Sequence, residues 1–363
     1  MALSHFNRYD KANSRQRTQF NCMTNVLSKS SLVLCAVGVD VAKDTLSICR
    51  RYSGGEKETV SIRNNEADIA KFIKEKLSGY KEKIVMESTG RYHYLSAITF
   101  SEKGFDARVI NPLITKKYSS GAIRKVKTDA RDAEMLAEIA IKEDNLPRQF
   151  NSSRKDLEIR KKIGLLGSLE KQLQQLKSIL ADYSETKEQL KMKMSMAEKD
   201  LLKVVEKISA AKEKLEKEIS ALSLEDESRA KLAELYATIP GVSKYLAAVC
   251  SYFFETEYDD DCKQWVAYAG LDVSVKQSGK WNGRGKLTKR GNPYLRKRLF
   301  CAAWGAMMHD SDFKNYYEYL REQGRSYVEA MVIISRKIVR IMFCLAKNNS
   351  VYDPALLNLP SAN

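Results

Sequence analysis

The chain has 363 residues, of which 44% are hydrophobic, so it can bury more than one core and is expected to form two or three domains. Its 62 Lys and Arg residues outnumber its 46 Asp and Glu residues, and the net charge of +16 favours a polyanionic partner over a small acidic metabolite. The longest apolar run near the N-terminus, residues 32–39, is far too short to span a bilayer, so we predict no transmembrane segment. Charge alone leaves nucleic acid and a membrane surface open as partners.

Residues 1–31 are polar and basic and lack the apolar stretch of a secretory signal, which favours a disordered arm. The seven cysteines are an odd number and include no CxxC pair, which argues against a cysteine zinc site or a redox motif. The three histidines include no close pair, so histidine-based metal sites are not expected. A reducing cytoplasm fits this composition best.

An α/β domain is predicted for residues 32–150. Strands are expected at 32–40, 45–52, 58–62, 83–87 and 105–110, with helices at 66–77 and 91–104. Short turns join the first three strands, which fits an antiparallel start to a mixed sheet. The order of three strands, helix, strand, helix, strand and helix is that of the ribonuclease-H-like fold.

Four acidic residues of this domain lie where a strand ends or a helix begins. Asp40 directly follows the first apolar strand and Glu87 ends the fourth, so both are expected at the same edge of the sheet. Asp129 and Asp132 are spaced i, i+3 at the start of a helix that Thr128 can cap, so they project from one face. Each of them taken alone also fits a turn, a cap or the helix dipole.

The combination is more specific than any one of these residues. Converged carboxylates repel one another, and divalent cations relieve that repulsion. Four oxygen ligands in the order Asp, Glu, Asp, Asp can hold two Mg²⁺ ions, the arrangement that clamps the attacking and leaving oxygens in phosphodiester cleavage. Lys127 and Arg131 flank Asp129 and are predicted to contact backbone phosphates.

Residues 151–228 show a coiled-coil pattern. Apolar residues recur at steps of three and four residues: Leu166, Leu169, Leu173, Leu176 and Leu180. The polar stretch 184–189 is expected to interrupt the helix before the pattern resumes at Leu201. Two long helices that form a hairpin or a dimer seam are favoured, and one long solvated helix is the alternative.

Residues 229–350 form a third region that is predicted to be mostly helical, and a tail follows at 351–363. The region contains the string IPGVS, in which Gly241 precedes a polar step and an apolar helix. This pattern is similar to the hairpin of helix-hairpin-helix modules, whose backbone N–H groups hold a phosphate. A simple helix-turn-helix corner that requires Gly241 is the alternative.

The third region also contains a basic segment without acidic neighbours. No Asp or Glu occurs from Val273 to His309. The predicted nucleic-acid contacts in it are Lys276, Lys280, Arg284, Lys289, Arg290 and Arg296. Ser278 lies among them, where the cations would lower the cost of an alkoxide and steady a pentavalent transition state, so it is a candidate nucleophile. The alternative is that Ser278 only turns the chain or hydrogen-bonds a phosphate.

Several strings occur in the order typical of one protein family, from about residue 34 to about residue 348: GVDVAKD, MESTGRYH, NP…KKYSSG with KTDARDA, IPGVS, YAGLDVSVKQSGK and LTKRGNPYLRKRL. In these strings the chain resembles DEDD-type insertion-sequence transposases, the bridge-RNA-guided serine recombinases related to the pilin-gene inverting protein. So many motifs in the same order make a chance likeness improbable. The chain departs from the pattern at Asp272 and Val273, where many relatives have a proline, and its N-terminal arm is longer than the family needs.

The resemblance implies a RuvC-like domain in which Asp40, Glu87, Asp129 and Asp132 bind metal, a coiled coil, and a C-terminal transposase domain with Ser278 as the nucleophile. Mg²⁺ is the implied cofactor, and Mn²⁺ is expected to substitute for it. The implied partners are donor and target DNA, a structured non-coding guide (bridge) RNA that selects the sequence, and further copies of the chain in a dimer or a tetramer, with no membrane. The expected location is the bacterial or archaeal cytoplasm, at the nucleoid when DNA is bound.

The predicted function is therefore transposition of an insertion sequence by site-specific DNA recombination, through a phosphoserine intermediate. One alternative is a metal-only endonuclease of the Holliday-junction-resolving type, which would form no protein–DNA adduct. The other is a non-catalytic nucleic-acid-binding assembly protein, which would tolerate Asp129→Asn and Asp132→Asn.

Overall fold

The computed structural model describes residues 33–80, 83–119, 128–254, 261–274, 277–278, 281–282, 285–357 and 359–360. The chain divides into two compact units, Met1–Arg154 and Lys155–Asn363. The predicted N-terminal arm lies outside the described residues. Within the described ranges, no helix combines the length and the hydropathy that crossing a bilayer requires. The six cysteines in these ranges are free thiols.

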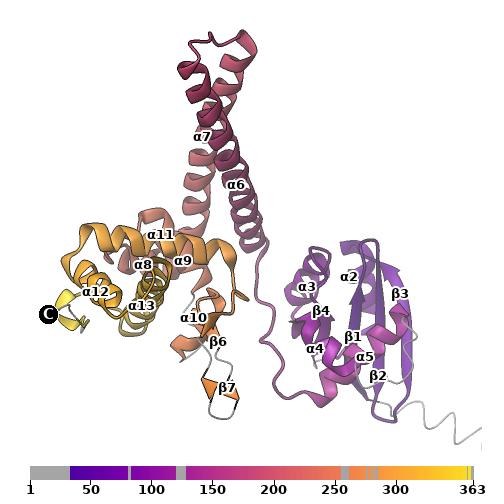
Figure 1. The fold of residues 1–363 in the computed structure, drawn as a ribbon. Helices are drawn as coiled ribbons and strands as arrows, with labels where there is room; N and C mark the ends of the chain where they lie inside the picture. Colours follow the sequence, from indigo (N-terminus) through magenta and orange to yellow (C-terminus); the bar gives the residue numbers. More distant parts are fainter. Residues whose placement is uncertain are drawn as a thin grey trace, which may run out of the picture. The chain divides into compact units, whose positions relative to one another are not determined.

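The first unit is built on a five-stranded mixed sheet with the order β3-β2-β1-β4-β5 (Figure 1). Its strands are β1 (Leu34–Val41), β2 (Thr45–Tyr52), β3 (Lys57–Arg63), β4 (Ile84–Glu87) and β5 (Ala107–Ile110). The first three strands pair antiparallel, whereas β4 runs parallel to β1 and β5 runs parallel to β4. The predicted antiparallel start of a mixed sheet is confirmed.

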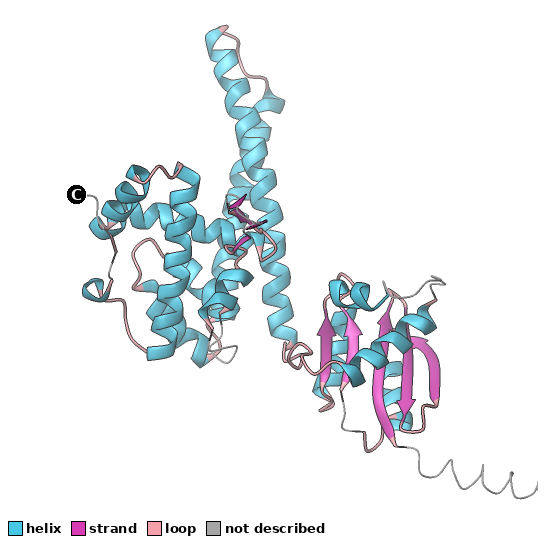
Figure 2. Cartoon of the chain, turned by 60° about the horizontal axis from the view of Figure 1, so that its bottom comes forward, coloured by secondary structure: helices cyan, strands magenta, loops and turns pink. Residues whose placement is uncertain are grey.

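Helices cover both faces of this sheet (Figure 2). They are α2 (Glu66–Lys76), α3 (His93–Glu102), α4 (Pro112–Ser119) and α5 (Asp129–Lys142). On one face, Val37 and Val39 of β1 share a core with Phe72 of α2 and Phe100 of α3. On the other face, Ala36 of β1 packs with residues of α5. The adjacent strands β1 and β4 carry apolar residues on both faces. The centre of the sheet is therefore buried between the two helical layers.

Gly38 allows α5 to lie directly on β1. A Cβ atom at this position would lie 2.2 Å from the carbonyl oxygen of Ala133 and 2.3 Å from the backbone nitrogen of Ala137. Any larger residue would therefore meet helix backbone, which cannot move aside as a side chain can. The close approach fixes the height of α5 above the first strand.

The second unit begins with a hairpin of two long helices, α6 (Arg154–Gln189) and α7 (Met196–Ser223) (Figure 1). They pack through Leu173, Leu180 and Val205, which form one cluster. Near the turn, Nζ of Lys187 lies 2.7 Å from a carboxylate oxygen of Glu198. Two long helices forming a hairpin were among the predicted arrangements.

The predicted interruption at 184–189 is wrong, because α6 continues through this stretch to Gln189 and the break follows it. Glu185, Lys187, Glu188 and Gln189 have good helix propensity, and Lys187 is held by its ion pair with Glu198, so the helix continues. The break comes where Lys191 takes a positive φ of 53°. Ser195 then starts α7 in a capping box with Glu198, in which each side chain bonds the other residue's backbone N–H. Local cap chemistry, and not the polarity of the preceding stretch, sets the turn.

The rest of the second unit is mostly helical, as predicted. Its helices are α8 (Glu227–Ala237), α9 (Lys244–Phe253), α10 (Cys262–Tyr268), α11 (Pro293–His309), α12 (Ser311–Glu322), α13 (Tyr327–Asn348) and a short 3₁₀ helix, η3 (Pro354–Leu356). The core gathers around α13, where Ala330, Ile334, Ile338 and Met342 are each 0% exposed. These residues recur at every fourth position, so they form one buried stripe of the helix.

Four two-residue strands connect α10 to α11: β6 (Val273–Ser274), β7 (Gln277–Ser278), β8 (Trp281–Asn282) and β9 (Lys286–Leu287). The outer pair, β6 and β9, is antiparallel, and so is the inner pair, β7 and β8. The segment is therefore a hairpin that leaves the helical core and returns to it.

A cluster of charges and aromatic rings joins the helical hairpin to α9 and α11. Glu170 of α6 is 8% exposed and pairs with Arg298, while Lys297 approaches the same carboxylate at 3.0 Å. The Arg298 guanidinium also lies 2.8 Å from Glu216 of α7 and 5.2 Å from the ring centre of Tyr294. Because removing one partner leaves a buried charge without compensation, this cluster fixes the two helices against α11.

Candidate active site

Asp40 and Glu87 lie on the face of the sheet that α5 covers. Successive side chains of a strand point to opposite faces, so Asp40 shares the face of Gly38, which contacts α5. Glu87 shares the face of Val85 for the same reason, and Val85 packs against α5. The last paired residues of β1 and β4 directly precede these two acids, which are therefore level with each other. The predicted meeting of both acids at one edge of the sheet is confirmed.

Asp129 and Asp132 begin the helix that covers this face. Both lie in the first turn of α5. The Oγ1 atom of Thr128 accepts a hydrogen bond from the backbone N–H of Arg131 at 3.4 Å, so the predicted cap is confirmed. Arg131 itself is exposed at the helix start, and Lys127 lies outside the described residues.

The four carboxylates are close enough to influence one another. Burial raises the pKa of Asp40 from 3.8 to about 6, and repulsion by Asp132, Asp129 and Glu87 adds to this effect. A hydrogen bond from the backbone N–H of Val41 opposes the shift without cancelling it. The sequence thus folds into a local excess of negative charge on a chain that is basic as a whole.

The chemistry of this donor set fits a divalent cation. Carboxylate oxygens are the ligands that hard cations prefer, and a cation would relieve the repulsion that raises the pKa of Asp40. In the described part of the chain, however, no three Asp, Glu, His or Cys side chains are grouped tightly enough to hold one ion. The four residues are therefore gathered candidate ligands and not a preformed cage.

Thr115 belongs to this site, although sequence reasoning missed it. Its Oγ1 atom donates a hydrogen bond of 2.6 Å to Oε2 of Glu87, and the side chain is 5% exposed. Thr115 lies on α4, which starts after Asn111 accepts a hydrogen bond from the backbone N–H of Leu113 at 2.9 Å. A threonine in a short helix carries no sequence signal for this role, because the contact exists only once β5 and α4 bring the chain back to the end of β4.

The hairpin that carries Ser278 joins the helical part of the second unit through two short segments that touch each other. We call these segments, Tyr268–Asp272 and Thr288–Asn292, the neck. A Cβ atom on Gly291 would lie 2.2 Å from the backbone nitrogen of Gly270, so the two ends of the segment touch through glycine backbone. The backbone N–H of Asn292 donates to the carbonyl of Tyr268 at 2.7 Å. The chain therefore leaves and re-enters the helical core at a single point.

Asp272 and Thr288 close this neck with two hydrogen bonds. The backbone N–H of Thr288 donates to the carbonyl of Asp272 at 3.0 Å, and its hydroxyl donates to the Asp272 carboxylate. The resemblance described above had led us to expect a proline near Asp272. Its carboxylate supplies a link across the neck that a proline side chain cannot make.

The structure describes Ser278 through its backbone alone, in β7 opposite Trp281 of β8. Among the predicted contacts around it, Lys276, Lys280 and Arg284 lie outside the described residues. The nucleophile and these contacts remain predictions.

Three further predicted contacts follow the hairpin. Lys289 and Arg290 are exposed directly after β9, and Lys289 has a positive φ of 55°. Arg296 differs from them because it lies on α11 with its Nη1 atom buried, 2.2 Å from where a Cβ atom on Gly270 would be. Its guanidinium thus packs against Gly270 at the neck. The Arg296 side chain is therefore partly buried, whereas a phosphate contact was predicted to be exposed.

Gly241 forms the corner before α9. It has a positive φ of 79°, and a Cβ atom there would lie 2.2 Å from the carbonyl oxygen of Ala302 on α11. Ser243 then caps α9 by accepting a hydrogen bond from the backbone N–H of Leu246 at 3.2 Å. Conformation and packing both require glycine at this corner, and a phosphate contact at Gly241 stays a prediction.

Comparison with known proteins agrees with both halves of this description. Residues 37–183 match a family model of DEDD-type transposases, described as "Transposase", and residues 233–318 match "Transposase IS116/IS110/IS902 family". The pilin gene-inverting protein of Moraxella lacunata is 24% identical over 323 residues, which cover 87% of this chain and 97% of that protein. The Moraxella bovis protein of the same name is 23% identical over the same shares.

A third relative, the insertion element IS110 uncharacterized 43.6 kDa protein of Streptomyces coelicolor, is 26% identical over 88 residues, which cover 24% of this chain and only 22% of that protein. The two family models together match more than half of the chain, and both describe transposases. The chain therefore belongs to the IS116/IS110/IS902 transposase family and is an enzyme that cuts and rejoins DNA.

Proposed function

We propose that this transposase is an RNA-guided, site-specific recombinase that moves its own insertion sequence through a serine–DNA intermediate. The observation that carries the proposal is the gathering of Asp40, Glu87, Asp129 and Asp132 at the face of α5, where Asp40 has a raised pKa. Such a collection of like charges is costly without a cation, and it is typical of sites that do chemistry.

We assign a RuvC-like fold to the first unit. The assignment is supported by the sheet order β3-β2-β1-β4-β5, with an antiparallel first half and a parallel second half. It is further supported by the acids at the ends of β1 and β4 and at the start of α5. In this assignment residues 32–150 form the catalytic domain, 151–228 a coiled coil and 229–350 the transposase domain.

The DEDD-type domain indicates dependence on a divalent metal, and we propose Mg²⁺, with Mn²⁺ able to replace it. Asp40, Glu87, Asp129 and Asp132 would hold the metal, with Thr115 orienting Glu87. When bound, Mg²⁺ supplies charge that steadies the oxygens of a reacting phosphodiester.

Ser278 performs the covalent step in this proposal. Its Oγ atom attacks phosphorus and loses its proton, while the bond from phosphorus to the leaving sugar oxygen breaks and that oxygen gains a proton. The phosphoserine ester keeps the energy of the broken bond. A sugar hydroxyl of another strand then attacks the same phosphorus, which rejoins the DNA and frees Ser278.

We propose a guide RNA and an oligomer as the partners that complete the reaction with donor and target DNA. The family resemblance supports the RNA, since sequence choice then belongs to base pairing and the protein holds the backbone. Exposed apolar residues on the helical hairpin support a second copy of the chain: Ile179 is 65% exposed, Leu190 64% and Met196 70%. A dimer, and a tetramer when two duplexes exchange, follow from this arrangement.

The test is to incubate the protein with Mg²⁺, RNA transcribed from the flanks of its element and end-labelled donor DNA, and then to separate the products under denaturing conditions. We expect a protein–DNA adduct that Ser278→Ala abolishes while DNA binding is retained. Ser274→Ala is the matched control, because Ser274 lies on β6 of the same hairpin and its hydroxyl donates to the carbonyl of Lys286 at 3.3 Å. It should form the adduct normally.

Other outcomes would replace the proposal. Cleaved DNA without any adduct would identify a metal-only endonuclease. Full activity in cells after Asp129→Asn and Asp132→Asn would show that these two carboxylates do not hold the metal. Loss of DNA binding in Ser278→Ala would mean that the serine holds phosphate and does not attack it.

A further inference from the structure

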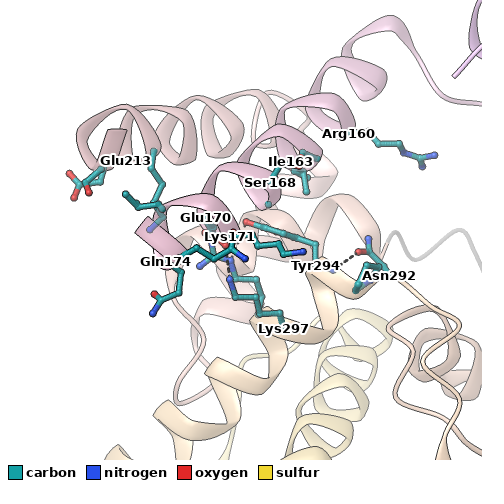
Figure 3. Close-up of a pocket in the computed structure, with 18 of the residues that line it drawn as sticks. Arg160, Ile163, Ser168, Glu170, Lys171, Gln174, Glu213, Asn292, Tyr294 and Lys297 are labelled. Atoms are coloured by element: carbon teal, nitrogen blue, oxygen red, sulfur yellow. Dashed lines mark hydrogen bonds and ion pairs between the residues drawn. The ribbon is translucent and has the colours of Figure 1, made fainter. Parts of the chain in front are cut away.

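A large groove in the second unit runs between the helical hairpin and the start of α11. Its volume is ≈ 1330 Å³, and side chains from α6, α7 and α11 surround it (Figure 3). Sites for small metabolites have volumes of roughly 300 to 1,000 Å³ and are mostly apolar. This groove exceeds that range, and about half of its lining residues carry charged or amide groups above partly apolar walls, which favours an extended ligand with both polar and apolar parts.

The groove is basic. Its cationic lining residues are Arg160, Lys171, Lys177, Lys212, Lys297 and Arg298, against two acids, Glu170 and Glu213. Glu170 is already neutralised by Lys297 at 3.0 Å and by Arg298. Lys297 remains 58% exposed at the side chain, so its ammonium still faces solvent. A polyanion entering the groove would meet a surplus of positive charge.

Two of these cations have no counter-charge in the described part of the chain. Lys171 and Lys177 are exposed on α6, six residues apart, and neither forms an ion pair there. Gln174 and Gln175 lie between them and also line the groove. Two amide donors between two ammonium groups along one helix can contact successive oxygens of a sugar–phosphate backbone.

The far end of the groove is the neck of the Ser278 hairpin. Tyr268 and Asn292, which line the groove, are also the two residues that the neck joins by a backbone hydrogen bond of 2.7 Å. Tyr268 is 43% exposed, and its ring lies 5.9 Å from that of Phe253, which lines the groove too. Exposed rings of this kind stack on bases whatever their sequence. A strand that follows the groove thus reaches the segment that carries the predicted nucleophile.

We propose that this groove holds the backbone of the DNA strand next to the phosphodiester that Ser278 attacks. Lys171 and Lys177 contact phosphates, the glutamines contact the backbone between them, and Tyr268 stacks on a base at the neck. This inference rests on the proposed serine chemistry for the position of the strand, but the binding itself requires no reaction.

The test is a comparison of DNA binding by the full-length protein and the double variant Lys171→Gln/Lys177→Gln. Binding of a fluorescent single-stranded DNA and of the matching duplex is measured by anisotropy over a series of salt concentrations. Each phosphate contact releases counterions, so the slope of log K against log salt should fall in magnitude by about 1.4 to 1.8 in the double variant. Affinity at moderate salt should fall with it.

Lys199→Gln is the matched control. Lys199 is an exposed lysine of α7 that forms no ion pair in the described residues and is absent from the groove. Its variant should lower the slope by less than half as much. Because all three lysines are exposed, unchanged thermal unfolding of the variants would exclude a folding defect as the cause.

An unchanged salt slope in the double variant, or an equal change in the control, would overturn the proposal. If the double variant lost affinity only for a single-stranded RNA of the same sequence, the proposal would also be overturned. The groove would then be a binding site for RNA. Failure of the serine chemistry is distinguishable, since native protein would then form no adduct while the difference in salt slope remained.

Discussion

Asp40 is the second-to-last residue of β1, on the face where Gly38 contacts α5, and its carboxyl feels the charges of Asp132, Asp129 and Glu87. Burial and this repulsion raise its pKa to about 6, whereas the unfolded chain has a pKa near 3.8. The native state therefore binds the proton more tightly than the unfolded state between these two values. Its stability falls as pH rises through this window and stays lower above it.

Asp40→Asn should therefore stabilise the metal-free protein at pH 7.5 while abolishing catalysis. We expect a gain of about 1 to 2 kcal/mol, because the side chain is partly exposed and a shift of one pKa unit is worth about 1.4 kcal/mol. Denaturant unfolding in EDTA at pH 7.5 and pH 4 measures it, and the gain should nearly vanish at the lower pH. Asp44→Asn is the control, since Asp44 is exposed. A less stable Asp40→Asn protein at pH 7.5 would contradict the repulsion.

Single residues also show what the sequence can and cannot predict. Asp40 and Glu87 were identifiable because strand ends and alternation are local properties. Thr115 was not, since its hydrogen bond to Glu87 spans 28 positions and depends on how the chain returns. The same holds for Arg298 and Glu170, which lie 128 positions apart and whose pairing no helical periodicity encodes.

At the scale of elements, the strands and most helices of the first unit were predictable because apolar stretches bounded by turn residues mark them, whereas the short helix α4 was missed. The predicted position of the break between α6 and α7 was wrong. The break depends on a positive φ at Lys191 and a cap at Ser195, and the polarity of the neighbouring residues indicates neither. The short strands β6 to β9 gave no periodic signal at all. Two residues are too few to alternate, so their pairing was found only in the structure.

The neck pair Asp272 and Thr288 yields a prediction at this scale. Asp272→Ala and Thr288→Val each remove the hydrogen bond between the side chains, which should loosen the Ser278 hairpin and slow adduct formation by roughly tenfold. The double variant should be no slower than either single one, because both changes remove the same bond. Single-turnover adduct formation measures this effect.

Asp272→Asn keeps the accepting oxygen and should restore most of the rate. DNA affinity should not change in any of these variants, since the neck pair faces its own segment. If the fold reductions in rate of the two single variants multiplied in the double variant, the two side chains would act separately.

At the scale of the whole chain, the division into Met1–Arg154 and Lys155–Asn363 implies two cooperative units. Each unit has its own core and contains a position at which a single substitution should destabilise that unit. In the first unit this is Gly38, where a methyl group would meet helix backbone. In the second it is Glu170, whose loss leaves Arg298 and Lys297 without their shared carboxylate.

Calorimetry should therefore resolve two transitions that respond to different substitutions. Gly38→Ala should lower one of them through a loss of about 3 kcal/mol from overpacking. Glu170→Gln should lower the other through a loss of about 2 to 4 kcal/mol from the broken buried pair. Gly164→Ala and Glu213→Gln are the controls, because a Cβ atom at Gly164 meets nothing within 4 Å and Glu213 is exposed. If both transitions moved together in either variant, the chain would unfold as one unit.

The contact between Gly270 and Gly291 at the neck makes the Ser278 segment an insertion whose two ends lie side by side. Because Gly270 and Gly291 are already in contact, the intervening residues can be lengthened, exchanged with those of a relative or removed without changing the distance that the helical core must bridge. A hybrid protein that takes this segment from a relative would need the two glycines and also the pairs that close the neck, Asp272 with Thr288 and Tyr268 with Asn292.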